Sequence, residues 1–188
     1  NINKDFIKEA KNIISKKLLY KKSAEYWEKR EATVCDMLGG NPEVNAIDIK
    51  ISKELIEDLY KNKQIKLNSV LDVGAGIGRV TSNVLKNYFT SIDLVERNKK
   101  FCETAINIFK NEENIKKIYC ASLQNFKFEK KYDCIWIQWC LENLEDDDLD
   151  SFLKTCKENL KDDGVIVIKE NIDEDNDFSY FDTDYSKI

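Results

Sequence analysis

Apolar residues recur every three or four positions over much of the first third of the chain, which is the spacing of one helix face. This spacing predicts helices over residues 3–18, 22–30 and 46–61. Between the second and third of these, Met37-Leu38-Gly39-Gly40-Asn41-Pro42 has the composition of a turn. The chain therefore begins with a predicted helical cap, which we place at residues 1–62.

After the cap, short apolar runs alternate with segments of helical spacing. The predicted strands cover residues 69–73, 90–95, 118–121, 132–139 and 165–168, and the predicted helices cover 78–87, 98–110 and 146–160. Strands that alternate with helices form a parallel sheet covered on both faces, so the sequence predicts a doubly wound α/β fold. A length of 188 residues suits a single domain, with this core at 68–171 and an acidic segment at 172–188.

The composition narrows the chemistry that the chain can perform. It contains no histidine and no Cys-x-x-Cys pair, so we expect no metal site and no Ser–His or Cys–His catalytic pair. The net charge of −5, without a basic stripe, argues against nucleic acid as a partner, and no apolar run is long enough for a membrane helix. The six cysteines predict a reduced protein of the cytoplasm, with the nucleus as a second expected location.

The sharpest local signal is Asp72-Val73-Gly74-Ala75-Gly76-Ile77-Gly78-Arg79, which follows a predicted strand and precedes a predicted helix. Glycine lets the backbone turn tightly and approach a ligand closely. A dinucleotide fingerprint has the spacing Gly-x-Gly-x-x-Gly, whereas this segment reads Gly-x-Gly-x-Gly and has Arg79 where the last Gly or Ala would stand. The spacing favours S-adenosylmethionine as the ligand and leaves a nicotinamide-dependent oxidoreductase as an alternative.

Two charged residues near this turn fit the same cofactor. Glu96 ends the second predicted strand, where a carboxylate can accept hydrogen bonds from both ribose hydroxyls. Arg79 can pair with the methionine carboxylate through its two-pronged guanidinium. For each residue the alternative is an ordinary surface side chain.

Several segments together resemble the α-N-terminal protein methyltransferases. These segments are Tyr26-Trp27, Met37-Leu38-Gly39-Gly40, the glycine segment 71–79, Ile135-Trp136-Ile137-Gln138-Trp139 and Ile166-Val167-Ile168-Lys169-Glu170-Asn171. The resemblance runs from residue 26 to the end of the chain. It implies the Rossmann-like fold of class I S-adenosylmethionine-dependent methyltransferases, with S-adenosylhomocysteine as product. It also implies methylation of the free α-amine of proteins that begin Xaa-Pro-Lys or Xaa-Pro-Arg.

The resemblance further implies a role for individual residues. The implied cofactor-binding residues are Trp27, Gly74, Gly76, Arg79, Glu96, Arg97, Leu123, Gln124 and Gln138. The implied peptide-binding residues are Tyr26, Met37, Leu38, Gly39, Val44, Trp139, Asp182 and Ser186. The implied catalytic residues are Asn143, Asn171 and Asp184.

Within these sets, Trp139 would pack on the substrate proline, and Trp136 points to the opposite face of its strand, where we expect core. The acidic loop with Asp182 and Asp184 would hold the basic third residue of the substrate, although an acidic run is often only a solvated tail. Asn171 would hydrogen-bond the peptide backbone near the α-amine.

Two departures from the family pattern limit these implications. Asn143 stands where the family carries a histidine that is a proposed proton acceptor, and asparagine cannot accept a proton at neutral pH. Either Asp184 and water take the proton, or an α-amine with a pKa of about 8 needs little help. The chain also ends at Ile188, so we expect two further strands of this fold to be missing and a sheet edge to be exposed.

Two further alternatives keep the fold and change the function. A methyltransferase-like module without activity would bind the cofactor and methylate no peptide, and a small-molecule methyltransferase would act on another substrate. The main interpretation predicts a monomer whose partners are protein or peptide N-termini, with ribosomal proteins among the expected substrates.

Overall fold

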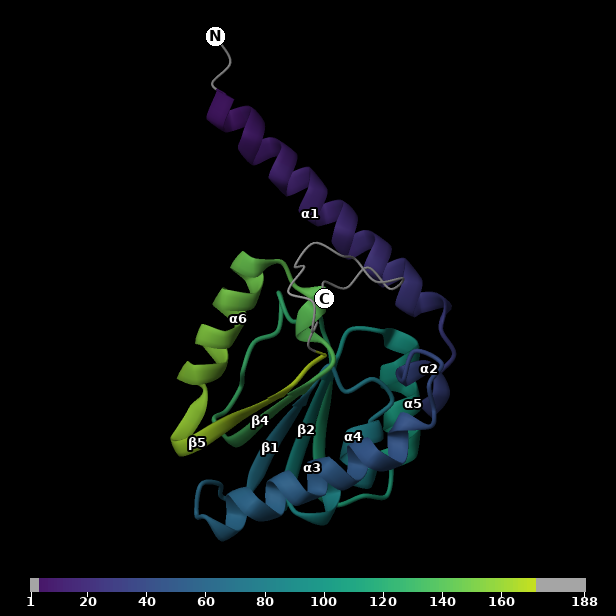
Figure 1. Cartoon of the computed structure of the whole chain (residues 1–188), viewed down its shortest axis with the longest axis vertical. Coiled ribbons are helices and arrows are strands. Elements are labelled where there is room, and N and C mark those ends of the chain that lie inside the picture. The colour runs from purple at the N-terminus through teal and green to yellow at the C-terminus, as the bar shows by residue number, and fades with distance from the viewer. Residues whose placement is uncertain (1–3, 172–188) are drawn as a thin grey trace.

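A sheet of five parallel strands forms the centre of the molecule, seen here in a computed structural model (Figure 1). The structure describes residues 4–171, and for residues 4–13 and 15 it describes the backbone alone. The strands are β1 (Ser69–Val73), β2 (Ser91–Glu96), β3 (Ile115–Cys120), β4 (Tyr132–Gln138) and β5 (Leu160–Lys169). Their order is β3-β2-β1-β4-β5, with every neighbouring pair parallel, which confirms the predicted fold class.

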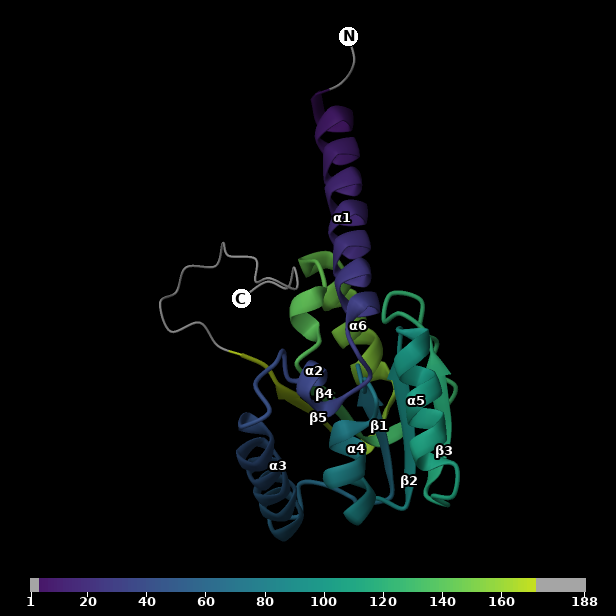
Figure 2. The ribbon, with the colours of Figure 1, turned by 90° about the vertical axis from the view of Figure 1, so that its right-hand side faces the viewer.

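Helices cover both faces of this sheet, as Figure 2 shows. The helices are α1 (Lys4–Lys29), α2 (Val34–Met37), α3 (Val44–Lys61), α4 (Arg79–Asn83), α5 (Lys99–Phe109) and α6 (Asp146–Glu158), with short 3-10 turns η1 (Leu85–Asn87) and η2 (Leu141–Asn143). Side chains from α3, α4 and α5 pack on one face of the sheet, and those of α6 pack on the other. Within residues 4–171, no helix has the length and apolar character that crossing a membrane requires.

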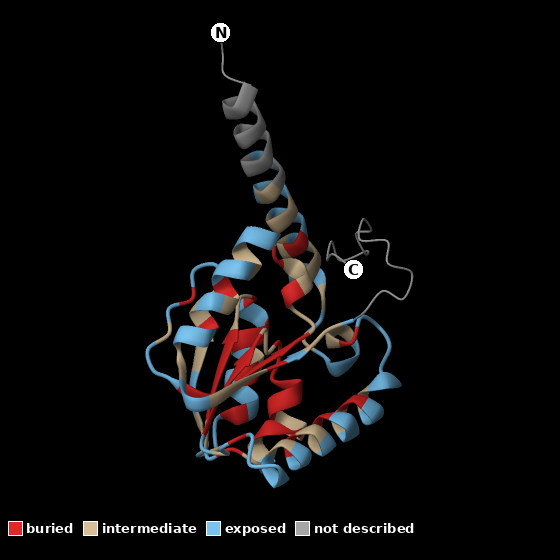
Figure 3. Cartoon of the chain, turned by 60° about the vertical axis from the view of Figure 1, so that its left-hand side comes forward, coloured by how far each residue is buried: buried red, intermediate tan, exposed pale blue. Residues whose placement is uncertain are grey.

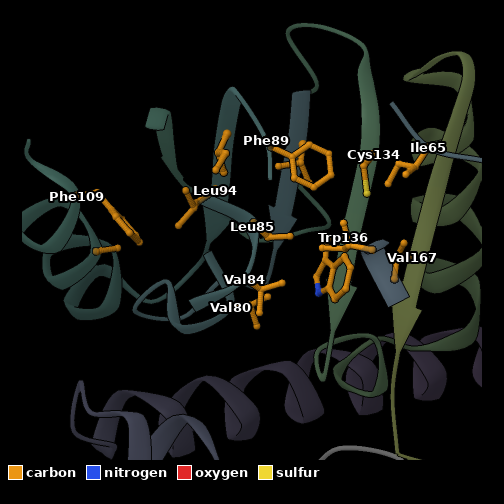
Figure 4. Packing of buried hydrophobic residues seen from close by; sticks show 14 residues of the cluster. Ile65, Val80, Val84, Leu85, Phe89, Leu94, Phe109, Cys134, Trp136 and Val167 are labelled. Carbon is orange, nitrogen blue, oxygen red and sulfur yellow. The ribbon is translucent and has the colours of Figure 1, made fainter. Parts of the chain in front are cut away.

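Successive residues of a strand contribute to two separate hydrophobic cores, one on each face of the sheet, because neighbouring side chains on a strand point to opposite faces. Trp136 is fully buried in the core under α3, α4 and α5, and Figure 4 shows it between Leu85 and Val167. Its strand neighbours Ile135 and Ile137 belong to the core on the α6 side. Every residue of β1 and β4 is buried, which is why both strands read as unbroken apolar runs (Figure 3).

The N-terminal helix differs from the prediction, because one helix replaces the two that were expected over 3–18 and 22–30. The connecting residues Leu19, Tyr20 and Lys21 include neither glycine nor proline, so nothing in the sequence interrupts the helix. Its first turns extend beyond the α/β body, and its last turns lie against the body (Figures 1 and 2).

Several other boundaries differ from the prediction. The helix expected over 78–87 divides at Val84, where the side-chain amides of Asn83 and Asn87 each donate to the carbonyl four residues earlier and compete with the backbone. β3 begins three residues before the expected start. β5 begins at Leu160, well before the expected 165, because at the sheet edge an irregular register lets exposed Lys161, Asp162 and Asp163 extend the strand.

The division of the chain into cap, core and loop stays a prediction, and residues 172–188 lie outside the described part of the chain. The strand order reverses between β1 and β4, since β2 and β3 lie on one side of β1 while β4 and β5 lie on the other. In open α/β sheets, ligands bind in the crevice at the carboxyl ends of the strands next to such a reversal.

Candidate cofactor pocket and active site

A pocket lies at the carboxyl ends of β1, β2 and β4, where the strand order predicts a ligand site. Its walls come from the loop after β1, the end of β2 and the end of β4, with Ser23 and Trp27 added from the last turns of α1. Two hydrogen bonds hold this end of α1 in place. Asn98 Nδ2 donates to the Trp27 carbonyl at 3.0 Å, and the Ser23 hydroxyl donates to Asn143 Oδ1 at 2.9 Å.

The loop after β1 needs its glycines for two physical reasons. Gly74, Gly76 and Gly78 have φ values of +66°, +57° and +80°, in the left-handed region that other residues rarely adopt. A Cβ on Gly74 would lie 2.6 Å from Cβ of Cys140, and one on Gly78 would lie 2.3 Å from the Phe109 ring. The missing side chains therefore let the backbone turn and let it form the pocket wall.

Glu96 closes β2 and faces this loop. Its Oε2 accepts from the Gly76 N–H at 2.9 Å, and its Oε1 accepts from the Asn98 N–H at 2.7 Å. Burial raises the pKa of Glu96, while the hydrogen bonds from Asn98 and Gly76 act in the opposite direction. A carboxylate offers about four acceptor sites, so Glu96, which lines the pocket, keeps acceptor capacity that ribose hydroxyls can use.

Asp72 is a second acid of the pocket, and sequence reasoning assigned it no role although it opens the glycine segment. Its side chain is buried and accepts from the Thr81 hydroxyl at 2.5 Å. Burial raises the pKa of Asp72 to about 6, against the hydrogen bond from Thr81 and the charge of Arg79, which lower it. At pH 7 the group is mostly ionised, and its negative charge suits a positively charged ligand such as a sulfonium.

Trp139 directly follows β4 and has an unusual backbone conformation. Its φ is +53°, which is a strained value for a bulky residue and is typical of functional sites. Its N–H donates to the Lys169 carbonyl at 2.9 Å, so the adjacent β5 holds this conformation. The indole lines the pocket, and the Arg79 guanidinium carbon lies 5.1 Å from the ring centroid, within the range of a cation–π contact.

A buried carboxylate that sequence reasoning missed, Asp48 on α3, connects several pocket residues. It accepts from Arg79 Nη1 at 2.8 Å, from Gln138 Nε2 at 2.8 Å and from Lys169 Nζ at 2.5 Å. Burial acts to raise the pKa of Asp48, but the hydrogen bonds from Lys169 and Arg79 outweigh it and hold that pKa below its usual range. The apolar spacing of α3 gave no signal for it, because Ile47 and Ile51 are exposed while Asp48 and Ser52 lie on the buried face.

The structure brings together the residues that were expected to bind the cofactor. All nine line the pocket, namely Trp27, Gly74, Gly76, Arg79, Glu96, Arg97, Leu123, Gln124 and Gln138. Asn143, at the end of η2, also lines it. Among the side chains that the structure describes, no group of Cys, Asp and Glu is arranged to hold a metal ion.

The residues expected to bind the peptide are placed less uniformly. Met37 and Trp139 line the pocket, whereas Tyr26, Leu38, Gly39 and Val44 are not part of its wall. Tyr26 packs edge-on against Trp27 with ring centroids 5.3 Å apart, Leu38 is buried within the fold, and Val44 is exposed. Asn171 is exposed and does not line the pocket. Asp182, Asp184 and Ser186 lie outside the described residues.

Comparison with known proteins identifies the family to which the chain belongs. Residues 15–188 match the model of a family described as AdoMet dependent proline di-methyltransferase. The chain belongs to this family. The predicted family and cofactor are thereby confirmed, and the family's use of S-adenosylmethionine disfavours the nicotinamide alternative.

Named relatives extend the family match. An alpha N-terminal protein methyltransferase 1 from Dictyostelium discoideum is 47% identical over 158 residues, covering 81% of this chain and 58% of that protein. The N-terminal Xaa-Pro-Lys N-methyltransferase 1 of Homo sapiens is 36% identical over 164 residues, covering 85% of this chain and 74% of that protein. The chain therefore spans 58% to 74% of the length of these relatives.

Solved structures agree with the family assignment. A SAM-dependent methyltransferase from Leishmania major has a TM-score of 0.78 and 35% identity, covering 83% of this chain and 62% of that chain. The complex of DhpI with S-adenosylhomocysteine has a TM-score of 0.66 at 15% identity, covering 84% of this chain and 71% of that chain. At that identity the second likeness shows the fold alone, and both support the Rossmann-like class I architecture.

Proposed function

We propose that the protein transfers a methyl group from S-adenosylmethionine to the free α-amine of proteins that begin Xaa-Pro-Lys or Xaa-Pro-Arg. The observation that carries this proposal is a single pocket whose wall contains all nine expected cofactor residues together with Trp139 and Asn143. The names of the relatives support it, because several are N-terminal Xaa-Pro-Lys N-methyltransferases.

The pocket fits the cofactor on three points of chemistry. Gly74 and Gly76 place bare backbone in the pocket wall, which an adenosyl group can approach closely, and Glu96 has acceptor capacity for ribose hydroxyls. Arg79 offers guanidinium N–H groups for the methionine carboxylate. When bound, S-adenosylmethionine supplies an electrophilic methyl group on a sulfonium.

The remaining task of the chain is to bring the α-amine into line with that methyl group. Asn143 Oδ1 accepts the Ser23 hydroxyl and keeps a second acceptor position, which we assign to an N–H of the neutral α-amine. Because an α-amine has a pKa of about 8, a usable fraction is neutral at pH 7, and water takes the proton released after transfer.

We propose that the peptide is placed against Trp139. A flat indole suits the rigid ring of proline, and Trp139 lines the pocket beside Arg79. We propose that the acidic segment with Asp182, Asp184 and Ser186 holds the basic third residue of the substrate, which would fix the register of the peptide.

The test is mass spectrometry of an Xaa-Pro-Lys peptide after incubation with the protein and S-adenosylmethionine. We expect the mass of one or more methyl groups on the α-amine. Matched peptides with an acetylated amine, or with alanine in place of proline, should remain unmodified. Binding of the cofactor without any methylation would favour the inactive-module alternative, and methylation of the acetylated peptide would contradict the α-amine as acceptor.

We also propose a cellular location, a substrate class and an oligomeric state for the protein. We infer a cytoplasmic and nuclear location from the six free thiols, which suit a reducing compartment. Ribosomal proteins as substrates and a monomeric state rest on the family resemblance.

A further inference from the structure

Asp48 links α3 to three other elements through one buried carboxylate. Its Oδ2 accepts from Arg79 on α4, and its Oδ1 accepts from Gln138 on β4 and Lys169 on β5. The side chain is 7% exposed, and that of Arg79 is 5% exposed, so water screens this ion pair weakly. Two of the three donors, Arg79 and Gln138, line the cofactor pocket, whereas Asp48 itself is not part of the pocket wall.

The contacts of Arg79 leave one part of its guanidinium unused. Asp48 Oδ2 and Asn45 Oδ1 both accept from the same nitrogen, Nη1, at 2.8 and 3.0 Å. Trp139 lies against the guanidinium, with its ring centroid 5.1 Å from the Arg79 Cζ. Within the described residues the other guanidinium nitrogens have no hydrogen-bond partner. Arginine is thus anchored at one nitrogen and by one ring, with donors left for a carboxylate.

Gln138 is fixed from both sides in a similar way. Trp136 Nε1 donates to its Oε1 at 3.1 Å, and its Nε2 donates to Asp48 at 2.8 Å. These two partners determine which end of the amide carries the oxygen. The same carboxylate therefore sets the orientation of two pocket side chains that come from different elements.

We propose that Asp48 is a positioning residue for the cofactor, which holds Arg79 so that the free donors of its guanidinium face the methionine carboxylate. Lys169 is the second cation of this cluster, and its Nζ also donates to the Ser52 hydroxyl at 2.7 Å. A buried carboxylate with three donors is well solvated by the protein and holds a fixed position. This role rests on the proposed pairing of Arg79 with the methionine carboxylate. The experiment therefore distinguishes a failure of that pairing from a failure of the positioning role of Asp48.

The test compares two ligands that differ in the amino-acid portion alone. S-adenosylhomocysteine carries the carboxylate, and 5′-methylthioadenosine lacks it but keeps the adenosyl group. By calorimetry we expect Asp48→Asn to weaken binding of S-adenosylhomocysteine roughly tenfold, the scale of one charge-assisted hydrogen bond, and to change binding of methylthioadenosine less than about twofold. Equal losses for both ligands, or an unchanged affinity for S-adenosylhomocysteine, would overturn the proposal.

The control is Asp58→Asn, which makes the same substitution on an exposed residue of α3 and should change neither affinity. If Asp48→Asn does not fold, the double variant Asp48→Asn with Lys169→Met removes the unpaired cation and should show the same selective loss. In an Arg79→Met background, Asp48→Asn should cause no further loss for S-adenosylhomocysteine, and an additional loss there would contradict a role through Arg79.

The Arg79 variant also separates this proposal from the cofactor orientation. If Arg79→Met alone leaves the affinity for S-adenosylhomocysteine unchanged, the proposed orientation is wrong, and the role of Asp48 falls with it. If Arg79→Met weakens that affinity and Asp48→Asn does not, only the positioning role is wrong.

Discussion

The two ends of the parallel sheet both bury charged side chains, but they use them differently. At the amino end of β1 and β4, Asp133 accepts from the Ser69 N–H at 2.9 Å, the Ser69 hydroxyl at 2.6 Å and Lys161 at 2.7 Å. At the carboxyl end, Glu96 is held by two backbone N–H groups and Arg79 by a single nitrogen. The amino-end carboxylate binds three protein donors and lies outside the pocket wall, whereas the carboxyl-end groups line the pocket and keep capacity for a ligand.

Residues with positive φ occur at both ends of the sheet, but in different surroundings. The carboxyl end of the sheet contains Gly74, Gly76 and Trp139, all with positive φ. At the amino end, Lys63 and Asp163 also have positive φ, but both side chains are exposed to solvent. At the carboxyl end the three residues line the pocket, so strain and unused hydrogen-bonding capacity occur together there, where a ligand would compensate both.

The strongest test of this contrast is Glu96→Ala. It removes both acceptors for the ribose hydroxyls and releases the Gly76 N–H, so the affinity for S-adenosylhomocysteine should fall about a hundredfold. Calorimetry measures this directly, and thermal unfolding of the free protein checks that the fold is retained. An unchanged affinity would contradict the ribose role.

Asp133→Asn tests the opposite end of the sheet. Removing the charge opposite Lys161 should lower the free energy of unfolding by about 2 kcal/mol and leave the affinity for S-adenosylhomocysteine unchanged. Chemical denaturation and calorimetry supply the two values. A loss of affinity similar to that of Glu96→Ala would remove the distinction between the ends.

The same carboxylate gives a pH dependence of stability. Burial acts to raise the pKa of Asp133, but hydrogen bonds from Lys161 and Ser69 outweigh it, so its folded-state pKa lies below the unfolded value. Its stabilisation is therefore fully present above the unfolded pKa of about 3.9 and is lost as pH falls through the folded pKa. Asp133→Asn should remove this contribution from the acid-unfolding curve.

Asp184→Asn tests the acidic loop, which sequence alone assigns to the substrate. Turnover of an Xaa-Pro-Lys peptide should fall at least about tenfold because one charge-assisted contact to the basic residue is lost. A peptide with a neutral third residue is the control, and its already low rate should not change further. Equal rates for the variant and the parent on the lysine peptide would refute the loop assignment.

The smallest expected effect is on proton transfer. With Asn143 in the pocket, the rate should rise with pH up to the α-amine pKa of about 8, without a step near the pKa of histidine. Asn143→His should raise the rate at pH 7 about threefold and add a limb that rises through about pH 6.5. A wild-type profile with an additional inflection near pH 6, below the one at the α-amine pKa, would show that another group takes the proton.

Much of the cofactor site could be predicted from the sequence, because its residues lie at fixed places relative to apolar runs. The glycine segment follows β1 and Glu96 ends β2, so parallel pairing of the two strands brings them together. Long-range pairings were not predictable in this way. The structure buries Asp48 on α3 and exposes its apolar neighbour Ile47, so spacing alone does not reveal the buried face. Nothing local to Asp48 indicates Arg79, Gln138 or Lys169 as partners.

The end of β4 was missed for a related reason. The apolar run from Tyr132 continues to Trp139 in the sequence, so the strand was expected to include it. The positive φ of Trp139 is set by its neighbours in space, including the Lys169 carbonyl on β5, and a bulky aromatic residue gives no local sign of it.

Because the backbone at Trp139 is left-handed, protein stability and catalysis favour different residues at this position. Glycine or asparagine adopts this conformation with less strain, and the indole is only partly buried, so little packing would be lost by replacing it. Directed evolution that rewards heat resistance alone would tend to discard the tryptophan. Evolution that rewards catalysis would retain it, and sequencing the survivors of the two regimes would show what this residue is kept for.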